Sequence, residues 1–212
     1  MISLNYSGQN GAFCLELDRV KLLLEKLESP EKNFFIIHVA GTNGKGSVCS
    51  FVETGLISMG IKCGVFMSPE LFCTEDSIRV CGKPIESAKL KNILSLLNSA
   101  SKAVEEELGK PPSAFETLFA AALLHFKKEK CTHVVLECGM GGAGDATNAI
   151  EHSDICVFSN IGIDHSEYLG DTLAKITANK CGIIKEETMV ISAEQKLEAE
   201  KIILEYCKQK NV

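Results

Sequence analysis

Two kinds of hydrophobic pattern alternate along the chain. Short runs of apolar and β-branched residues, bounded by turn-forming residues, are typical of strands buried in a sheet. Longer stretches in which apolar residues recur three or four positions apart are typical of amphipathic helices. The short runs predict strands at about 34–40, 61–67, 132–137, 154–160 and 189–192. The helical spacing predicts helices at about 15–28, 45–59, 88–108, 113–129, 172–184 and 194–209.

Local signals mark several of the boundaries. Ser29-Pro30 ends the first helix, and the stretch from Gly109 to Pro112 stops the third. Ser113 and Glu116 have the spacing of a capping box at the start of the fourth helix. Residues 68–84 are polar and rich in turn formers, so we expect an excursion over the functional site there.

Because helices separate successive strands, we expect an α/β fold with a mostly parallel sheet flanked by helices. In such sheets, ligands bind at the carboxyl ends of the strands. Four places stand at or just after the ends of predicted strands: a glycine-rich loop that starts at residue 41, Ser68, Glu137, and the segment after Asn160. The sequence therefore predicts that these four places meet at one edge of the sheet.

The composition argues against several classes of protein. Hydrophobic residues make up 45% of the 212 residues and charged residues 24%, which is ordinary for a globular core. The formal net charge of −6 argues against nucleic-acid or membrane-surface partners. No apolar run reaches membrane-spanning length, and residues 1–14 lack the basic and apolar regions of a signal peptide. The ten cysteines are scattered without a C-x-x-C pair, so we interpret them as buried free thiols of a cytoplasmic protein.

The glycine-rich loop is Gly41-Thr42-Asn43-Gly44-Lys45-Gly46-Ser47. It departs from the usual phosphate-binding pattern because Gly46 separates Lys45 from Ser47. Glycines let backbone N–H groups approach phosphate oxygens, and the N-terminus of the following helix favours anions. Lys45 would supply charge to the β- and γ-phosphates of ATP, and Ser47 is a candidate Mg²⁺ ligand. The alternative is an ordinary glycine-rich turn between a strand and a helix.

Three other side chains have both a functional and a structural interpretation. Glu137 ends an apolar strand, where a carboxylate is costly unless it is paired or binds a metal. It is therefore either a partner of Ser47 around Mg²⁺ or a salt-bridged strand end. Taken alone, His165 is more often a hydrogen-bonded structural residue, and Lys180 would be a solvated surface lysine.

The stretch from His38 to Ser47, H-V-A-G-T-N-G-K-G-S, closely resembles the ATP loop of the folylpolyglutamate synthase/dihydrofolate synthase family of the Mur ligase superfamily. Its G-K-G-S ending is similar to the folate branch, whereas the peptidoglycan ligases usually carry G-K-[ST]. The resemblance covers nearly the whole chain from about residue 15. Further stretches agree in order: Ser68-Pro69, Phe115-Glu116, residues 137–142 with 145–148, and residues 161–165 with 169–170 and 180–185.

This resemblance implies an ATP-dependent amide ligase with a P-loop NTPase-like domain, the central domain of the Mur ligases. Such enzymes pass the γ-phosphoryl group of ATP to a carboxylate, and the amine of glutamate then attacks the acyl phosphate. The implied cofactors are ATP and Mg²⁺, and the implied substrates are L-glutamate with a folate or dihydropteroate. Catalysis would rest mainly on positioning and on charge neutralisation.

The resemblance also implies a set of metal ligands. Glu137 matches a metal ligand of the family, as do Ser68 and His165, and they would join Ser47. Asp164 beside His165 and the surrounding match favour metal ligation by this histidine over the structural interpretation.

A lysine matching Lys180 is carbamylated in the family and supplies a carboxylate-like ligand for a second Mg²⁺. Carbamylation needs a neutral amine, so we expect Lys180 to be buried with a lowered pKa. Lys185 is the alternative, although it matches the trailing lysine of the family rather than the modified one. The candidate catalytic residues are Lys45, Lys180 and His165.

The pterin side of the site is implied by the same resemblance. Phe115 would stack on a pterin ring, although a phenylalanine on a helix is more often core. Asp145, Ala146 and Thr147 lie on the loop where the family contacts dihydropteroate or folate. The structural alternative is an Asx turn made by Asp145 and Asn148.

Several residues depart from the family pattern. Ala143 and Gly144 stand where the family generally carries an arginine and an apolar residue. Asp76-Ser77 replaces a Glu-Arg pair, Glu70 replaces a histidine, and Asn179 replaces a glutamate. Loss of two arginines weakens the anchoring of an anionic folate more than it weakens nucleotide binding.

Members of the resembling family are considerably longer than 212 residues. We therefore expect residues 1–212 to be an incomplete N-terminal and central ATP-binding domain, truncated before the C-terminal glutamate-binding domain, with little or no ligase activity by itself. Two alternatives stay open. One is a UDP-muramoyl peptide ligase, which Gly46 disfavours, and the other is a degenerate, non-catalytic ATP-binding module, which Ala143 and Ser77 favour.

Overall fold

The structure, a computed structural model, describes residues 16–212, so the signal-peptide expectation, Cys14 and Leu15 lie outside the described residues. Within that range, seven strands form one sheet in the order β4-β3-β2-β5-β1-β6-β7. Neighbouring strands among the five predicted positions run parallel, which confirms the mostly parallel sheet. These strands are β1 (Phe35–Ala40), β2 (Cys63–Phe66), β5 (His133–Glu137), β6 (Ile155–Phe158) and β7 (Met189–Ser192).

Helices form at all six predicted positions, with ends within a few residues of those expected. They are α1 (Asp18–Lys26), α2 (Lys45–Ser58), α3 (Ser87–Leu108), α4 (Ala114–Lys128), α6 (Leu173–Cys181) and α7 (Leu197–Lys210). The predicted capping box is present, because the Ser113 side chain accepts from the Glu116 N–H and the Glu116 carboxylate accepts from the Ser113 N–H. Shorter elements that the sequence did not predict are α5 (Ser166–Leu169) and the 3₁₀ turns η1 (Pro30–Asn33), η2 (Thr74–Ser77) and η3 (Ala146–Ala149).

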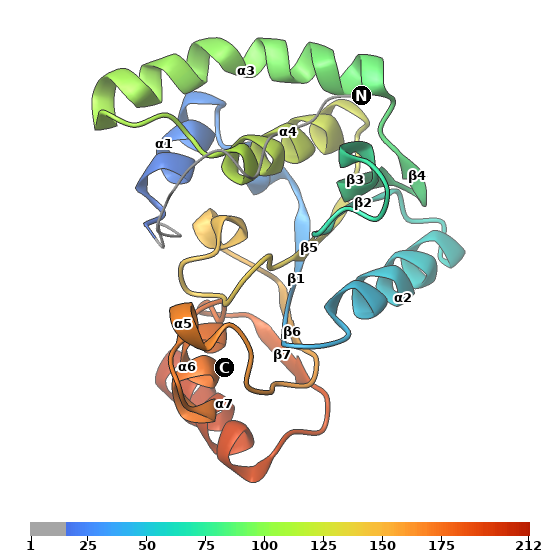
Figure 1. Cartoon of the computed structure of the whole chain (residues 1–212). Coiled ribbons are helices and arrows are strands. Elements are labelled where there is room, and N and C mark those ends of the chain that lie inside the picture. Colours follow the sequence, from blue (N-terminus) through green and yellow to red (C-terminus); the bar gives the residue numbers. More distant parts are fainter. Residues whose placement is uncertain (1–15) are drawn as a thin grey trace.

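Both faces of the sheet are covered, as expected for parallel strands. On one face, Ile36 of β1 packs in a cluster with α1, α3 and α4, which lie together on one side of the sheet in Figure 1. On the other face, Ile37 and Val39 pack with Leu56 of α2. Helices α6 and α7 cover β6 and β7, where Phe158 is fully buried. Because β1 is covered on both faces, the loop that follows it starts from a fixed position.

The second half of residues 68–84 differs from the predicted excursion. Residues 68–77 form a loop, but two short strands, β3 (Ile78–Val80) and β4 (Lys83–Pro84), then join the sheet. β3 pairs antiparallel with β2, with Arg79 opposite Val65. The predicted excursion over the site is therefore wrong for residues 78–84, which belong to the sheet.

A buried ion pair explains why β3 forms despite its central arginine. The Arg79 guanidinium lies 2.7 Å from the Glu53 carboxylate of α2, and both side chains are largely buried. The other Glu53 oxygen accepts from the Gly82 N–H at 2.8 Å. This strand is hard to predict from the sequence, because an arginine stands between its two apolar residues and the carboxylate that pairs with the arginine lies on a distant helix.

Six of the nine cysteines in the described part of the chain are buried, in agreement with the expected buried free thiols. No helix within residues 16–212 has both the length and the apolar character needed to cross a membrane.

Candidate active site at the strand ends

The glycine-rich loop joins the end of β1 to the start of α2. Gly41 has a φ of 152°, and a Cβ there would lie 1.8 Å from the Ser159 hydroxyl. Gly44, which precedes the first residue of α2, has a φ of 84°, in the left-handed region. Gly41 is therefore required by its close approach to Ser159, and Gly44 by its left-handed backbone. The loop leads into the N-terminus of α2, whose first backbone N–H groups have no partner within the helix and favour an anion.

Thr42 fastens this loop to the loop that follows β6. Its backbone N–H donates to the Asn160 carbonyl at 2.9 Å. Its hydroxyl donates to the Gly162 carbonyl at 3.1 Å and accepts from the Gly162 N–H at 3.0 Å. Lys45, at the first position of α2, donates from Nζ to the Thr42 carbonyl at 3.3 Å. Ser47 is exposed two residues further along.

Glu137 ends β5 beside the loop, with Val39 as its partner in register. It is only 4% exposed, and its Oε2 accepts from the Ser68 N–H at 3.3 Å. A Cβ on Gly46 would lie 3.7 Å from that oxygen, so the carboxylate faces the first turn of α2. Burial raises the pKa of Glu137 to about 7, although Lys45 opposes the shift. Among residues 16–212 no cation lies within ion-pair distance of this carboxylate, so the salt-bridged alternative is not what the structure has.

Ser68, Phe115 and Asp145 converge on Gly139, just past β5. A Cβ on Gly139 would lie 3.3 Å from the Ser68 hydroxyl, 3.3 Å from Asp145 Oδ2 and 2.9 Å from Phe115 Cζ. The Ser68 hydroxyl is buried and has no hydrogen-bond partner among residues 16–212. An orphaned buried hydroxyl is costly, so it fits a place where a ligand supplies the missing contact.

The residues expected to contact a pterin, Phe115, Asp145 and Ala146, all make contacts with other residues of the chain. The Phe115 ring is half-buried and lies 5.6 Å from the Phe66 ring, so it is both part of the core edge and a wall of the site. The Asp145 carboxylate accepts from the Met140 N–H at 2.8 Å and from the Thr147 N–H at 3.0 Å. The second bond has Asx-turn geometry, as in the structural alternative. Ala146 is buried in the main core cluster.

Lys180 lies on α6 and is only 3% exposed, so it is not the solvated surface lysine that the isolated sequence suggested. Its Nζ donates to the Gly41 carbonyl at 2.7 Å, directly behind the glycine-rich loop. Burial, together with the nearby charge of Lys45, lowers the pKa of Lys180 to about 8. Lys185 instead reaches the Asn148 carbonyl at 3.5 Å, away from this loop. The lowered pKa agrees with the expected buried lysine, whereas carbamylation stays a prediction.

His165, a predicted metal ligand, lies in a more exposed place than Glu137 and Lys180. It precedes α5 in a left-handed conformation with a φ of 49°, and its ring is half exposed. Its Nε2 lies 3.6 Å from the Asp164 carboxylate. In the part of the chain that is described, no three His, Cys, Asp or Glu side chains converge as a metal cluster. Metal ligation by His165 therefore stays a prediction.

The family model described as the Mur ligase middle domain matches residues 39–211. The chain belongs to the Mur ligase middle domain family. The match begins within β1 and ends one residue after α7, so it includes the glycine-rich loop and the strand ends described above.

Curated relatives and solved structures of this family resemble the chain over most of its length. It is 36% identical to dihydrofolate synthase/folylpolyglutamate synthase of Bacillus subtilis and 35% identical to dihydrofolate synthetase of Saccharomyces cerevisiae, over 88% and 92% of this chain. These alignments cover 44% and 45% of the relatives. Mycobacterium tuberculosis folylpolyglutamate synthase complexed with ADP superposes with a TM-score of 0.89 at 30% identity, over 94% of this chain and 46% of that one. E. coli FolC in complex with DHPP and ADP gives a TM-score of 0.87 at 31% identity, over 96% and 47%. The chain thus spans about half the length of these relatives.

One buried network in this Mur ligase domain was missed by sequence reasoning. His38 in β1 is fully buried, and its Nε2 lies 2.8 Å from the Thr147 hydroxyl and 3.2 Å from the Cys138 sulfur. The Thr147 hydroxyl donates to Asp145, so it accepts from His38 and fixes the tautomer that carries hydrogen on Nε2. Burial lowers the pKa of His38 to about 3, so the ring is neutral. A histidine inside an apolar strand is the signal that could have found this network.

Proposed function

We propose that this chain is the ATP-binding part of a ligase of the folylpolyglutamate synthase/dihydrofolate synthase type. Such a ligase joins L-glutamate to the carboxylate of a folate or dihydropteroate through an acyl phosphate. The observation that carries the proposal is the buried Lys180 amine on the Gly41 carbonyl, 2.7 Å away, beneath a loop of phosphate-binding form. A buried amine with a lowered pKa is unusual in a structural role and is suited to chemistry.

Residues 41–47 would bind the phosphates of ATP. The accessible N–H groups at the start of α2 favour an anion, and Lys45 adds a positive charge at the same point. Solved relatives support this assignment, since they were solved in complex with ADP and AMPPCP. In the transition state, Lys45 and the loop would stabilise the charge on the transferred phosphoryl group.

The oxygen donors at the strand ends fit Mg²⁺. The orphaned Ser68 hydroxyl and the Glu137 carboxylate, which lacks a cation partner, are ligands that Mg²⁺ accepts. Ser47 would join them, and His165 and a carbamylated Lys180 would hold a second ion. Bound Mg²⁺ would neutralise the phosphate charge and orient the γ-phosphoryl group.

Folate or dihydropteroate would bind at the Gly139 side of the site. Phe115 offers a ring edge there, and the Asp145–Ala146 loop lies next to it. Relatives solved in complex with folate or with DHPP support this class of substrate. Glutamate and the closure of the cleft would come from a C-terminal domain, with residues 1–212 as an incomplete N-terminal and central domain. We propose a cytoplasmic location from the composition, while some relatives carry mitochondrial names.

Titration calorimetry of Mg·ATP against this chain tests the nucleotide assignment. Replacing Lys45 by alanine removes a charge-assisted phosphate contact, so the affinity should fall about tenfold or more. Lys208→Ala, an exposed position at the end of α7, is the matched control and should bind as the wild type does. Unchanged affinity in Lys45→Ala would refute the role given to Lys45.

Substrate class is tested separately by titrating the chain, saturated with AMPPCP and Mg²⁺, with pterins and with a UDP-muramoyl compound. Binding of dihydropteroate or tetrahydrofolate supports the folate assignment. Binding of the UDP-muramoyl compound alone would reverse it. ATP binding without any pterin binding would favour the degenerate module that Ala143 and Ser77 suggest.

A further inference from the structure

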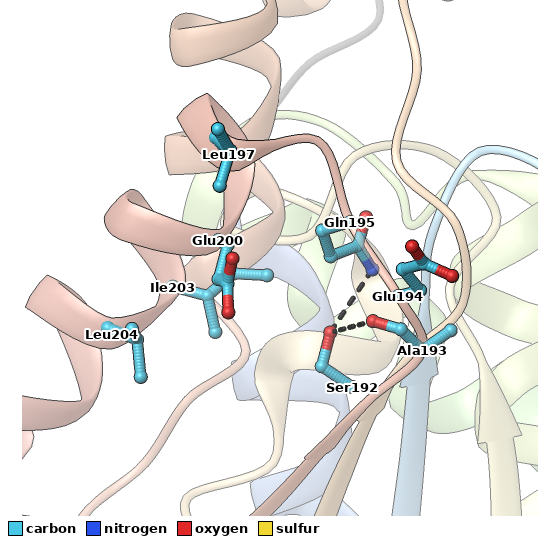
Figure 2. A pocket seen from close by; sticks show the side chains of 8 residues that line it. All are labelled: Ser192, Ala193, Glu194, Gln195, Leu197, Glu200, Ile203 and Leu204. Atoms are coloured by element: carbon cyan, nitrogen blue, oxygen red, sulfur yellow. Dashed lines mark hydrogen bonds between the residues drawn. The ribbon is translucent and has the colours of Figure 1, made fainter.

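Gln195 lies between β7 and α7, at the carboxyl end of the sheet and outside the set of predicted site residues. Its Nε2 donates to the Ser159 carbonyl at 2.9 Å and to the Ser192 hydroxyl at 3.1 Å. Its Oε1 accepts from the Ile161 N–H at 2.9 Å. Figure 2 shows Gln195 next to Ser192 in the wall of a cavity of about 520 Å³. One amide thus holds both a carbonyl and an N–H of the loop that follows β6.

The same loop is held from its other side by the end of β1 and the glycine-rich loop. The Ser159 N–H donates to the Ala40 carbonyl at 2.9 Å. Thr42 bonds to Asn160 through its backbone and to Gly162 through its hydroxyl. Residues 159–162 are therefore held by hydrogen bonds to Gln195 on one side and to Thr42 on the other.

We propose that Gln195 is a positioning residue for the nucleotide site, acting through residues 159–162 on Thr42. This inference rests on the proposed function in one respect, because it takes ATP as the ligand of residues 41–47. Among uncharged side chains of this length, only an amide offers two donors and an acceptor together. Loss of the amide leaves the Ser159 carbonyl and the Ile161 N–H without their side-chain partner, and the loop loses its fixed distance from the glycine-rich loop.

The contacts also separate this proposal from a merely local role. If Gln195 had only a local role, its loss would affect the backbone amide of Ile161 alone, because this N–H donates directly to the Gln195 side chain. A positioning residue must also restrain Thr42 and Gly162, which it does not touch. Exchange of the backbone amides of these three residues therefore distinguishes the two roles.

Gln195→Glu is the informative variant, because it keeps the shape of the side chain, removes both donors and places a carboxylate oxygen against the Ser159 carbonyl oxygen, and repulsion between the two oxygens drives the side chain away from the loop, Ile161 included. The matched control is Gln209→Glu, which adds the same charge at an exposed position of α7. We expect amide exchange at Ile161, Gly162 and Thr42 to become about tenfold faster in Gln195→Glu and to stay unchanged in the control. Mg·ATP affinity, measured by calorimetry, should fall about tenfold in the same variant.

Faster exchange at Ile161 alone, with unchanged exchange at Thr42 and unchanged ATP affinity, would overturn the proposal. Gln195→Met, which is uncharged and similar in length, repeats the test if Gln195→Glu fails to fold, and the same pattern is expected. A wild-type chain that binds no ATP would refute the proposed function, whereas the exchange comparison would still decide whether Gln195 restrains the glycine-rich loop.

Discussion

At the residue scale, the site contains two buried titratable groups whose pKa values move in opposite directions. Burial raises the pKa of Glu137 to about 7 and lowers that of Lys180 to about 8. Both shifts have the same physical cause, since burial disfavours the charged form of an acid and of a base alike. Each group therefore titrates near neutral pH, where its protonation state can be measured.

Lys180 is expected to form a carbamate with CO₂ in a pH-dependent way. Nitrogen attack on CO₂ requires the neutral amine, and the fraction of neutral amine rises as the pH passes through about 8. At a fixed concentration of dissolved ¹³CO₂, the carbamate NMR signal of the chain should therefore grow between pH 7 and 9. It should vanish in Lys180→Arg and persist in Lys185→Arg. A signal lost in Lys185→Arg instead would transfer the assignment to Lys185.

Glu137 is expected to make the metal-free chain less stable as the pH rises. The folded-state pKa of about 7 lies above the ordinary value of 4.5, so the folded state binds the extra proton between these values. The stability contribution is complete below pH 4.5 and is lost as the pH rises through about 7, by about 3 kcal/mol in total. Urea denaturation should show this loss relative to Glu137→Gln, whose side chain is always neutral.

The control for this comparison is Glu205→Gln, which removes an exposed carboxylate from α7. The difference between Glu137→Gln and wild type should change with pH by about 3 kcal/mol more than the difference between Glu205→Gln and wild type. An equal pH dependence of the two variants would contradict the raised pKa of Glu137.

At the element scale, the position of β2 depends on a glycine that touches α4. A Cβ on Gly64 would lie 2.5 Å from the Phe126 ring, which is fully buried. Gly64→Ala should therefore overpack the core and lower the free energy of unfolding by about 1–3 kcal/mol. Urea denaturation measures the change.

Gly55 provides a control with the same chemical change in a different setting. It lies inside α2, and within residues 16–212 no atom outside its own stretch of helix comes within 4 Å of a Cβ placed there. Gly55→Ala should raise the free energy of unfolding by about 0.5–1 kcal/mol, because alanine favours the helix. Destabilisation by Gly55→Ala, or none by Gly64→Ala, would contradict this account of the packing.

Elements with a strong periodic pattern could be predicted from the sequence, and the weakest one could not. The five parallel strands and six helices follow from apolar runs and helical spacing. β3 was missed because Ile78, Arg79 and Val80 are too few to show alternation, and the arginine needs Glu53 of α2 to be buried. Ion pairs between distant segments leave no periodic signal in a single sequence.

At the scale of the whole molecule, the chain covers about half of each relative described above. Under the proposed function, in which a further domain supplies the glutamate side of the cleft, a polypeptide of these 212 residues is expected to bind Mg·ATP without glutamate-dependent hydrolysis. Phosphate release in the presence of dihydropteroate and glutamate measures this, with the Bacillus subtilis relative as the positive control. Glutamate-dependent release that disappears in Lys45→Ala would contradict the expectation.

The sequence by itself determined the α/β architecture, the glycine-rich loop and the strand ends that carry Glu137 and Ser68, because periodicity and local turn chemistry are properties of neighbouring residues. Only the tertiary structure decided that Lys180 is buried against the Gly41 carbonyl, that the Ser68 hydroxyl is left without a partner, and that Gln195 clasps the loop after β6. These features arise where segments distant in sequence meet and exclude water. Desolvation depends on that meeting and on no single stretch of the chain.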